Sequence, residues 1–427
     1  MQFKAYPFWH EGITFPTGAA GALPARADVA IIGGGLTGLA AARTLARSGA
    51  TTLLFETQHI GWGASSRNGG QVLTGLKLDA PTLLKQYGRD RARRFFAASL
   101  AAIDLVEQIA LEERFECAFH RHGHLLLAAR PSHMRILVDE AELLARHFDH
   151  QVQLCSREAM QAEIATDAYF GCMLDPLSAG VDPARYVVGL AHAAQRAGAH
   201  LWDHTTVQDV QRERGGFVLQ TTRGTVRTAQ IVVASGGYTG NAIRTVQRKL
   251  VPLGSYVVAT EPLPPGVAAE LIPRDRMIFD SRNLLHYFRL SPDRQRLLFG
   301  GRAGFFPETP ATVRESAVIL RKMLVEVFPV LRAVQIEYAW GGTLDTSFDF
   351  MPHAGGKDGF FYAVGYAGHG VALGSYLGTL VATLMLGTPC DNPFGELPFP
   401  GAPLGLYSGR PWFLPLAGLY YGIKDRL

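Results

Sequence analysis

The chain has few cysteines and none of the spacings in which cysteines usually act together. Its 427 residues contain four of them, Cys117, Cys155, Cys172 and Cys390, without a C-x-x-C pair or another metal-ligand pattern. We therefore expect reduced thiols, no disulfide framework and no bound metal. The N-terminus also lacks the basic region, apolar stretch and small-residue cleavage site of a secretory signal, so the predicted location is cytoplasmic.

Charge and long apolar runs are also modest. The 41 basic and 37 acidic residues leave a net charge of +4, which is not gathered in a lysine-rich block, so nucleic acid is not a predicted partner. The most apolar long stretch, 360–387, contains His369 and several glycines, and it predicts a buried strand and helix rather than a transmembrane segment. A chain of this length with 48% hydrophobic residues suggests two or three domains with a large core.

The most informative stretch begins with the short apolar run Val29 to Ile32, which predicts a buried strand. Three glycines follow at once, and then an Ala/Leu-rich helical segment runs from Leu36 to Ser48. Gly33, Gly35 and Gly38 fit G-x-G-x-x-G, in which the glycines allow a tight turn, close approach to a pyrophosphate and close helix packing. We expect a phosphate at this helix start, beside Leu36 and Thr37.

An acidic residue stands at the spacing that this fingerprint requires. The second apolar run, Thr51 to Phe55, ends at Glu56, 21 residues after Gly35. A carboxylate at this position can accept both ribose hydroxyls of an adenosine and would repel a 2′-phosphate. The chain is therefore predicted to bind a dinucleotide, and these residues leave NAD and FAD both open.

The next segment, GWGASSRNGGQ from Gly61 to Gln71, does not continue into the helix and strand of an NAD domain. Its glycines and small hydroxyls suit close approach to a large flat cofactor and its second phosphate, with backbone amides and an arginine as donors. An ordinary polar loop is the other interpretation. The predicted cofactor contacts in this loop are Ser65, Ser66, Arg67, Asn68, Gly69 and Gly70.

Near the C-terminal third, the strand Phe360 to Val364 stops at GYAGHG, directly before an apolar helix from Val371 to Leu386. A second helix N-terminus is therefore expected at the site. If the dinucleotide is FAD, the positive dipole end of this helix would favour the anionic pyrimidine end of the reduced flavin.

Three motifs, IIGGGLTGLAAARTLARSG, IGWGASSRNGGQ and GYAGHGVALG, resemble the D-amino-acid oxidase superfamily of FAD-dependent amine oxidoreductases. Within it the chain is most similar to the gamma-glutamylputrescine oxidase branch, over about residues 27–386. The resemblance implies an α/β fold (α+β overall), in which a Rossmann-like FAD-binding domain is interleaved with an antiparallel-sheet substrate domain. It implies a small-molecule amine as substrate and oxidation of a C–N bond.

The resemblance also divides the chain. It implies an N-terminal arm (1–27), an FAD-binding domain (28–78, 171–248 and 339–387), a substrate domain (79–170 and 249–338) and a C-terminal extension (388–427), whose last residues are either a packed helix or a partner surface. The further cofactor contacts that it implies are Val207 at the adenine, Ala234 and Gly236 near the pyrophosphate, Gly341 and Gly342 against the flavin, and Gly368, His369, Gly370 and Val371 at the second helix start.

Flavin chemistry makes few demands on catalytic side chains. The flavin takes a hydride from the carbon next to nitrogen, so the protein must position the amine, keep it neutral and exclude water. A chain without an evident triad or metal cluster fits that task. The candidate catalytic residues are His369, Tyr256, His286 with its neighbour Tyr287, and Arg302, which could hold a substrate carboxylate. Core or surface roles remain open for each.

Two departures from the family limit the prediction. No cysteine lies between Ala339 and His369, where some relatives attach flavin, so we predict non-covalent FAD. No lysine lies between Lys249 and Lys322, where sarcosine-oxidase-type members use one to promote reaction with oxygen, so oxidase and dehydrogenase both remain open. O2 or another electron acceptor is expected, and the oligomeric state is not predicted.

The predicted reaction gives an imine that hydrolyses to an aldehyde or other carbonyl product. The first candidate substrate is a gamma-glutamylated polyamine. The alternatives are an amino-acid or N-methyl-amino-acid oxidoreductase of the sarcosine or D-amino-acid type, and a subunit in which FAD is structural.

Overall fold

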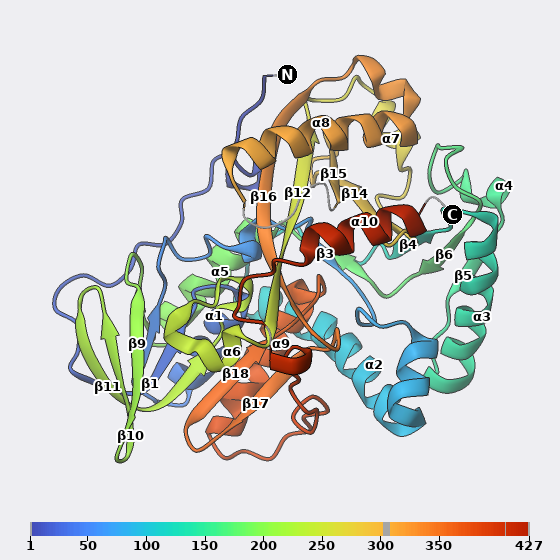
Figure 1. The fold of residues 1–427 in the computed structure, drawn as a ribbon. Helices are drawn as coiled ribbons and strands as arrows, with labels where there is room; N and C mark the ends of the chain where they lie inside the picture. The colour runs from blue at the N-terminus through green and yellow to red at the C-terminus, as the bar shows by residue number, and fades with distance from the viewer. Residues whose placement is uncertain (1, 302–307, 406, 426–427) are drawn as a thin grey trace.

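Two large β-sheets organise the chain (Figure 1). The computed structural model describes residues 2–301, 308–405 and 407–425. The first sheet has the order β17-β18-β11-β1-β2-β8, with the β9–β10 hairpin continuing antiparallel from β11. Its strands are β1 (Arg26–Ile32), β2 (Thr52–Phe55), β8 (His200–Trp202), β9 (Val207–Glu213), β10 (Gly216–Thr221), β11 (Gly224–Val233), β17 (His353–Lys357) and β18 (Phe360–Val364).

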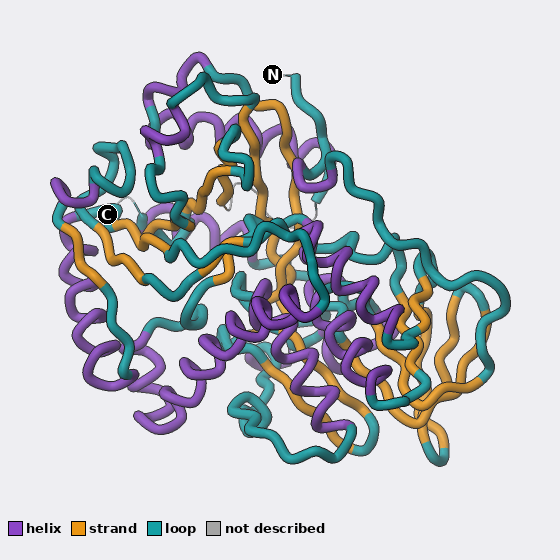
Figure 2. Tube along the Cα trace, turned by 180° about the vertical axis from the view of Figure 1, so that it is seen from behind, coloured by secondary structure: helices purple, strands orange, loops and turns teal. Residues whose placement is uncertain are grey.

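Five neighbouring strands of the first sheet run parallel, namely β18, β11, β1, β2 and β8. Their apolar runs, such as TLLF in β2, are buried on both faces. Leu54 packs with helix residues on one face, and Leu53 and Phe55 pack with Phe217 and Leu219 of β10 on the other. Figure 2 shows helices lying across these strands, with the β9–β10 hairpin projecting at the edge. The main helices on the same side of the molecule as the first sheet are α1 (Leu36–Arg47), α2 (Ala80–Glu112), α5 (Pro183–Arg196) and α9 (Gly370–Met385).

Helices α1 and α9 pack closely because α9 carries glycines at every fourth position, Gly370, Gly374 and Gly378. A Cβ atom on Gly378 would come within 2.2 Å of the Thr37 carbonyl oxygen, and one on Gly374 within 3.3 Å of the Thr37 hydroxyl. Helix α1 follows β1 and α9 follows β18. The two helix starts therefore lie together at the carboxyl edge of the first sheet, where α/β folds bind ligands.

The second sheet has the order β16-β12-β15-β14-β13-β4-β6-β5 and is antiparallel except for the β4–β13 pair. Helix α8 (Pro310–Val327) begins with a Thr309 capping box and buries Leu320 and Leu324 in the second sheet's core. The strands are β4 (His124–Leu127), β5 (Gln153–Cys155), β6 (Cys172–Asp175), β12 (Leu250–Thr260), β13 (Met277–Asp280), β14 (His286–Leu290), β15 (Leu297–Gly301) and β16 (Ile336–Ser347).

Short elements complete the fold. Strands β3 (Gln71–Val72) and β7 (Ala179–Gly180) form a small antiparallel pair. The remaining α-helices are α3 (Pro131–Phe148), α4 (Arg157–Met160), α6 (Arg244–Gln247), α7 (Val267–Leu271) and α10 (Leu414–Lys424). The 3₁₀ turns are Phe8–His10, Ala64–Ser66, Gly236–Tyr238, Asn241–Ile243, Pro329–Ala333 and Pro403–Gly405.

The predicted fold class is confirmed, since a parallel sheet with covering helices is combined with a mainly antiparallel sheet. Strands β6 and β16 both lie in the second sheet. The predicted ranges had given all of β6 and most of β16 to the FAD-binding domain. Strand β16 continues through Gly341 and Gly342, which pair with Tyr256 and Ser255 of β12. The Tyr256 ring would lie 2.9 Å from a Cβ on Gly341, so glycine fits there. The division into two domains remains our proposal, with these strands counted to the second sheet.

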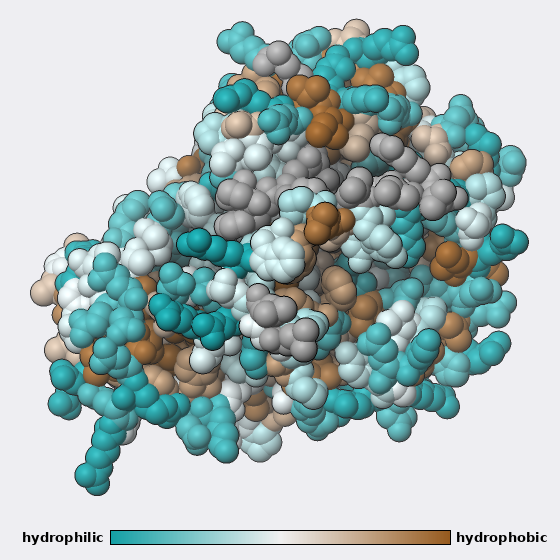
Figure 3. Space-filling view, in the orientation of Figure 1, coloured by the Kyte–Doolittle hydropathy of each residue, from teal (hydrophilic) through white to brown (hydrophobic). Residues whose placement is uncertain are grey.

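The C-terminal extension both packs and exposes apolar surface. Tyr407 and Leu414 are buried against Val251 and Leu253 of β12. Near them Trp412, Leu416 and Tyr420 are each more than 60% exposed. The surface seen in Figure 3 is otherwise mostly hydrophilic with separate apolar spots. Of the helices that the structure describes, none is long and apolar enough to cross a lipid bilayer.

Candidate functional site

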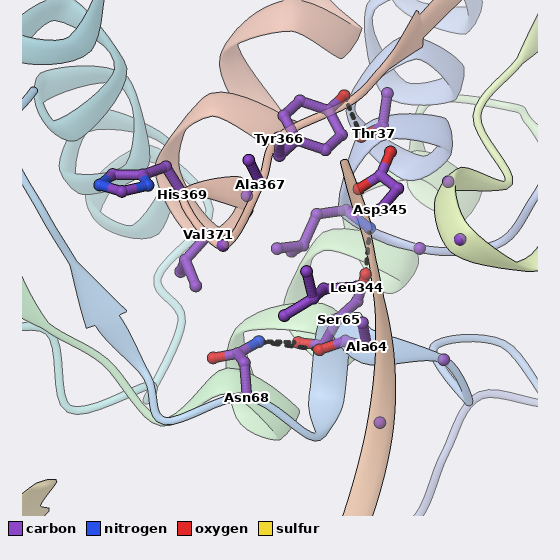
Figure 4. Close-up of a pocket in the computed structure, with 18 of the residues that line it drawn as sticks. Thr37, Ala64, Ser65, Asn68, Leu344, Asp345, Tyr366, Ala367, His369 and Val371 are labelled. Atoms are coloured by element: carbon purple, nitrogen blue, oxygen red, sulfur yellow. Dashed lines mark hydrogen bonds between the residues drawn. The ribbon is translucent and has the colours of Figure 1, made fainter. Parts of the chain in front are cut away.

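A cavity of about 870 Å³ opens at the carboxyl ends of β1 and β18 and continues between the two sheets. Most of the predicted cofactor residues line it, and Figure 4 draws part of its lining as sticks, with Thr37, Ser65, Asp345 and His369 among the labelled residues. The predicted residues on its wall are Gly33, Gly35, Leu36, Thr37, Glu56, Ser65, Arg67, Asn68, Gly69, Val207, Ala234, Gly236, Gly342, Gly368, His369, Gly370 and Val371.

The first glycine fingerprint forms a tight turn between β1 and α1. Gly33 has φ +114°, and a Cβ there would lie 2.6 Å from the Ala234 carbonyl oxygen. A Cβ on Gly38 would lie 1.9 Å from the Gly33 carbonyl oxygen, so only glycine lets the helix lie this close to the turn. Gly35 is the N-cap residue of α1, and as a glycine it has no side chain that could accept a hydrogen bond from the first amides of the helix.

Glu56 is held in place where β2 ends. Its Oε2 accepts a hydrogen bond from the Gly34 amide at 2.8 Å, and its Oε1 accepts one from the Gln58 amide at 3.0 Å. The carboxylate is therefore fixed beside the glycine turn and on the cavity wall, as the predicted ribose contact requires. Val207, Ala234 and Gly236 line the same cavity.

The glycine-rich loop 61–70 is stiffened by side chains that bind its own backbone. The Asn68 side chain donates to the carbonyls of Ala64 and Ser65 at 3.0 and 2.9 Å, and it accepts from the Gly70 amide at 2.7 Å. Trp9 of the N-terminal arm donates from Nε1 to the Asn68 carbonyl at 2.8 Å. The arm thus helps to hold the loop against the cavity.

Arg67 lies on the cavity wall but is already engaged. Its Nε donates to the Trp62 carbonyl at 2.7 Å, and its guanidinium lies 4.5 Å from the centre of the Trp62 ring. Its Nη1 is 3.4 Å from Glu308 and 3.3 Å from the Gly341 carbonyl. A role as phosphate donor therefore remains a prediction.

The second helix start faces the same cavity. His369 is the N-cap of α9, and its side chain makes no capping hydrogen bond to the described residues. A Cβ on Gly368, at φ +100°, would meet nothing within 4 Å. The Thr37 and Tyr366 hydroxyls are joined at 2.8 Å, which links the two helix starts (Figure 4).

Asp345 is a lining residue that we did not predict. Its carboxylate accepts a hydrogen bond from the Gly365 amide, and its carbonyl accepts one from the Ala367 amide at 2.8 Å. Complete burial raises the pKa of this carboxyl, and backbone hydrogen bonds act in the opposite direction. Asp345 therefore fixes the loop that leads into α9. Its role in the site depends on the contact between β16 and that loop, which no local sequence pattern indicates.

His369 is neutral at physiological pH. Burial, reinforced by the nearby charge of Lys77, lowers the pKa of its imidazole to about 3. Its Nδ1 is buried and has no hydrogen-bond partner among the described residues. This leaves one ring nitrogen available for a bound group, so a role in contacting cofactor or substrate remains a prediction.

The second sheet contributes Ser255 and Tyr287 to the cavity, joined by their hydroxyls at 3.1 Å. The predicted Tyr256 and His286 are not among the residues of the described cavity wall, and their catalytic roles remain predictions. Tyr256 donates to Thr312 at 3.1 Å, and His286 lies 3.3 Å from Asp280. Neighbouring residues of a strand point to opposite faces, and we had not assigned the face. Arg302 lies outside the described residues.

Four predicted cofactor residues support the wall without lining it in the described cavity. Gly38 packs under the turn, and the Ser66 hydroxyl donates to the Gly61 carbonyl at 2.6 Å. The Gly70 carbonyl accepts from Arg289 at 3.0 Å, and Gly341 lies against the Tyr256 ring.

Charged residues occupy a further part of the wall that our sequence analysis missed, namely Lys77, Asp79 and Glu140. Asp79 caps α2 by accepting from the Thr82 amide at 3.0 Å. Burial, together with the charge of Asp79, raises the pKa of Glu140 to about 7. A polar, partly ionisable end therefore adjoins the mainly apolar middle of the cavity.

The residues present fit a dinucleotide with a flat ring system. Two helix starts whose N-cap residues make no side-chain capping bond face one cavity, which favours anionic groups, and a fixed carboxylate stands at the ribose position. At the α1 start the Ser65 hydroxyl accepts from the Leu36 amide. The volume is at the upper end of the range for small-molecule sites.

Residues 28–384 match the model of the DAO family, described as FAD dependent oxidoreductase. The chain belongs to this family. It is therefore an FAD-dependent oxidoreductase that acts on the C–N bond of an amine or amino acid.

Similar proteins agree with this assignment. The chain is 31% identical over 403 residues to gamma-glutamylputrescine oxidoreductase of Escherichia coli (strain K12), covering 94% of this chain and 93% of that protein. It is 33% identical over 404 residues to the probable oxidoreductase OrdL of Rhizobium meliloti (strain 1021), covering 94% and 92%. Glycine oxidase from Geobacillus kaustophilus has a similar fold, with a TM-score of 0.75 at 24% identity, covering 89% of this chain and 99% of that chain.

Proposed function

We propose that this family member oxidises an amine whose far end carries charged groups, with a gamma-glutamylated diamine or polyamine as the first candidate. The observation that carries the proposal is the charged wall formed by Lys77, Asp79 and Glu140 in the same cavity as His369. The 31% identity to a gamma-glutamylputrescine oxidoreductase supports the same substrate class. A substrate as small as glycine has no charged far end for this wall to bind.

Bound FAD supplies the acceptor for a hydride from the carbon next to the amine nitrogen. For its binding, the α1 start and Glu56 would hold the ADP half, and loop 61–70 would hold the second phosphate and ribityl chain. The first turn of α9, at Gly370 and Val371, would face the pyrimidine ring. The described cavity wall includes no cysteine, in keeping with a non-covalent attachment.

The reacting amine would lie near Tyr287 and Ser255. Burial raises the pKa of the Tyr287 hydroxyl to about 12, so it stays protonated and can donate or accept a hydrogen bond. Phe279 and Leu285 line the same region and exclude water. A neutral amine is favoured in such surroundings because a desolvated ammonium is costly, and a neutral amine is the form that can lose a hydride.

The charged end of a gamma-glutamyl group carries one carboxylate and one ammonium. Lys77 would attract the carboxylate, and Asp79 with Glu140 would attract the ammonium. The two signs on the substrate are thus matched by two signs on the wall. Because Glu140 has a pKa of about 7, its attraction for an ammonium should grow as the pH rises from 6 to 8.

Replacing Glu140 with glutamine should therefore weaken binding in a pH-dependent way. For a gamma-glutamylated amine we expect a KM roughly tenfold above wild type at pH 8, as for the loss of one charge pair, and similar values at pH 6. The same variant should melt higher than wild type at pH 8. Glu140 has a higher pKa in the folded than in the unfolded protein, so the free energy of unfolding falls as the pH rises from the unfolded pKa through the folded pKa. The glutamine does not ionise, and therefore the variant does not lose this stability.

Glu142→Gln is the matched control, since Glu142 lies on the same helix with a 66% exposed side chain. It should change neither the KM nor the melting temperature by a comparable amount. An E140Q variant with an unchanged KM at pH 8 would contradict the placement of the substrate's charged end.

An amino-acid substrate is the second candidate. The chain is 28% identical over 377 residues to glycine oxidase of Geobacillus kaustophilus (strain HTA426). Arg302, outside the described residues, would then hold the α-carboxylate. In this case the charged wall would not determine specificity.

Anaerobic bleaching of the visible flavin band separates the candidates. The panel is gamma-glutamylputrescine, putrescine, sarcosine and several D- and L-amino acids, and the first should bleach the band fastest. Faster bleaching by amino acids would favour the second candidate, and no bleaching by any amine would favour a structural flavin. Oxygen uptake on readmitting air tests O2 as the acceptor, and denaturation of the same sample should release all of the flavin.

A further inference from the structure

Two histidines and an aspartate form a cluster where the loop before β4 meets the turn before β13. The His120 Nε2 atom lies 3.6 Å from the Asp275 Oδ2 atom, and the His122 Nδ1 atom lies 3.5 Å from the same oxygen. The three ligand atoms lie within 4.8 Å of one another. These separations are longer than hydrogen bonds. Ligands held tetrahedrally at metal distances of about 2.1 Å would be about 3.4 Å apart, which is close to the two histidine–aspartate separations.

The tautomer of His120 suits a metal ligand. Its Nδ1 lies 2.9 Å from the Ala118 carbonyl oxygen. A carbonyl only accepts hydrogen bonds, so Nδ1 carries the proton and the lone pair of Nε2 is left toward Asp275. Metal-binding histidines are commonly oriented by a backbone carbonyl in this way.

Buried polar atoms at the cluster lack other partners. His120 Nε2 and Asp275 Oδ1 are buried and make no hydrogen bond within the described part of the chain, and the same holds for Nη2 of Arg289. The Asp275 side chain is only 9% exposed. Buried polar atoms are normally satisfied, so their coincidence at one place indicates a bound group.

The backbone holds the ligands in position before any metal binds. His120 and Gly180 exchange two backbone hydrogen bonds, of 3.0 and 2.8 Å, and the Met277 amide donates to the Gly123 carbonyl at 3.1 Å. Arg276 bonds to the His122 carbonyl and, at 2.9 Å, to Glu163. A site that is preorganised loses less entropy on binding its ligand.

We propose that His120, His122 and Asp275 bind a divalent transition metal of the zinc class, with water as the fourth ligand. Imidazole and carboxylate donors in this number suit zinc and also accept cobalt or nickel. The His122 side chain is 47% exposed, which leaves room for the water. The metal would link the loop that carries the two histidines to the turn that carries the aspartate.

Arg289 limits the affinity that we expect for the metal. Its buried guanidinium acts electrostatically on both His120 and Asp275, so it opposes part of the metal's charge. We therefore expect weaker binding than in a zinc finger. Arg289 also donates to the carbonyls of Gly70 and Val181 at 3.0 and 2.9 Å, so the cluster lies one side chain away from the glycine-rich loop.

The test uses the full-length flavin-containing protein after removal of metals with a chelator. Titration calorimetry with Zn²⁺ alone should show one site per chain, and Co²⁺ should give the intense visible bands of four-coordinate cobalt beyond the flavin absorption. Zn²⁺ should also raise the melting temperature, because a ligand that binds only the folded state stabilises it.

The variants His122→Ala and Asp275→Asn should each weaken Zn²⁺ binding by roughly 100-fold or more, in line with the effects of changes around metal sites. His122 is largely exposed and outside the cavity wall, so H122A should keep its flavin content and its bleaching by substrate. His200→Ala, at an exposed histidine elsewhere, is the control and should bind like wild type. Absence of Zn²⁺ and Co²⁺ binding in wild type, or equal binding in H122A, would overturn the proposal.

Discussion

Replacing Gly35 with valine should yield a folded protein without bound flavin. The backbone of Gly35 (φ −90°, ψ −170°) is open to any residue, so the effect comes from the side chain. A Cβ atom there would lie 2.5 Å from the Ser65 hydroxyl, which accepts a hydrogen bond from the Leu36 amide at 3.0 Å. The valine would displace Ser65 and occupy the space that a phosphate needs at the α1 start. The measurement is the ratio of flavin to protein absorbance after purification.

Gly401→Val is the matched control, because a Cβ at this exposed glycine would meet nothing within 4 Å. It should bind flavin as wild type does. Overpacking at Gly35 should cost about 1–3 kcal/mol, which a chain of this size tolerates, so circular dichroism should still show a folded protein. A G35V protein that purifies yellow would count against the phosphate turn.

The parts of the site that were predictable are those encoded in one continuous stretch. Gly33, Gly35 and Gly38 lie within six residues of each other, and Glu56 follows one short strand later. Their geometry depends on local turn and helix rules, and therefore the sequence alone indicates where they lie. The GYAGHG segment is similar, because a strand that stops at glycines before an apolar helix defines a helix start.

The parts that escaped prediction depend on contacts between distant segments. Of the strand residues predicted at the pocket, Tyr287 lines the cavity and Tyr256 and His286 do not, and Ser255 lines it without having been predicted. Which residues face the cavity depends on which face of the second sheet is covered. Lys77 and Glu140 reach the same cavity from positions 63 residues apart (140 minus 77), which no local pattern records. The sequence shows that such residues exist but not that they meet.

Asp345 illustrates how distant pairing builds the cofactor end of the cavity. Strand β16 crosses from the second sheet to the loop before α9, where Thr346 pairs with Tyr366. This pairing places the Asp345 carboxylate at the Gly365 amide, and Tyr366 in turn bonds to Thr37 on α1. One buried carboxyl thus connects the second sheet to both helix starts.

Asp345→Ala should therefore lose both stability and flavin. The substitution leaves the buried amides of Gly365 and Tyr366 without their acceptor, and each such group costs about 1–3 kcal/mol. We expect a melting temperature lower by roughly 5 °C or more, and a weaker flavin complex because the loop into α9 is no longer fixed. Thermal unfolding followed by circular dichroism, together with fluorescence of released flavin, measures the two effects.

Asp345→Asn separates hydrogen bonding from charge. Burial raises the pKa of Asp345, so its ionised form is disfavoured in the folded protein, and the stability it contributes declines as the pH rises above its unfolded pKa. The neutral amide keeps one acceptor oxygen for the Gly365 amide and carries no such penalty. D345N should therefore retain flavin and compare best with wild type at high pH. D345N and D345A differ mainly in the side-chain oxygen that accepts the Gly365 hydrogen bond. If D345N lost flavin as completely as D345A, the carboxylate charge rather than this hydrogen bond would hold the site together.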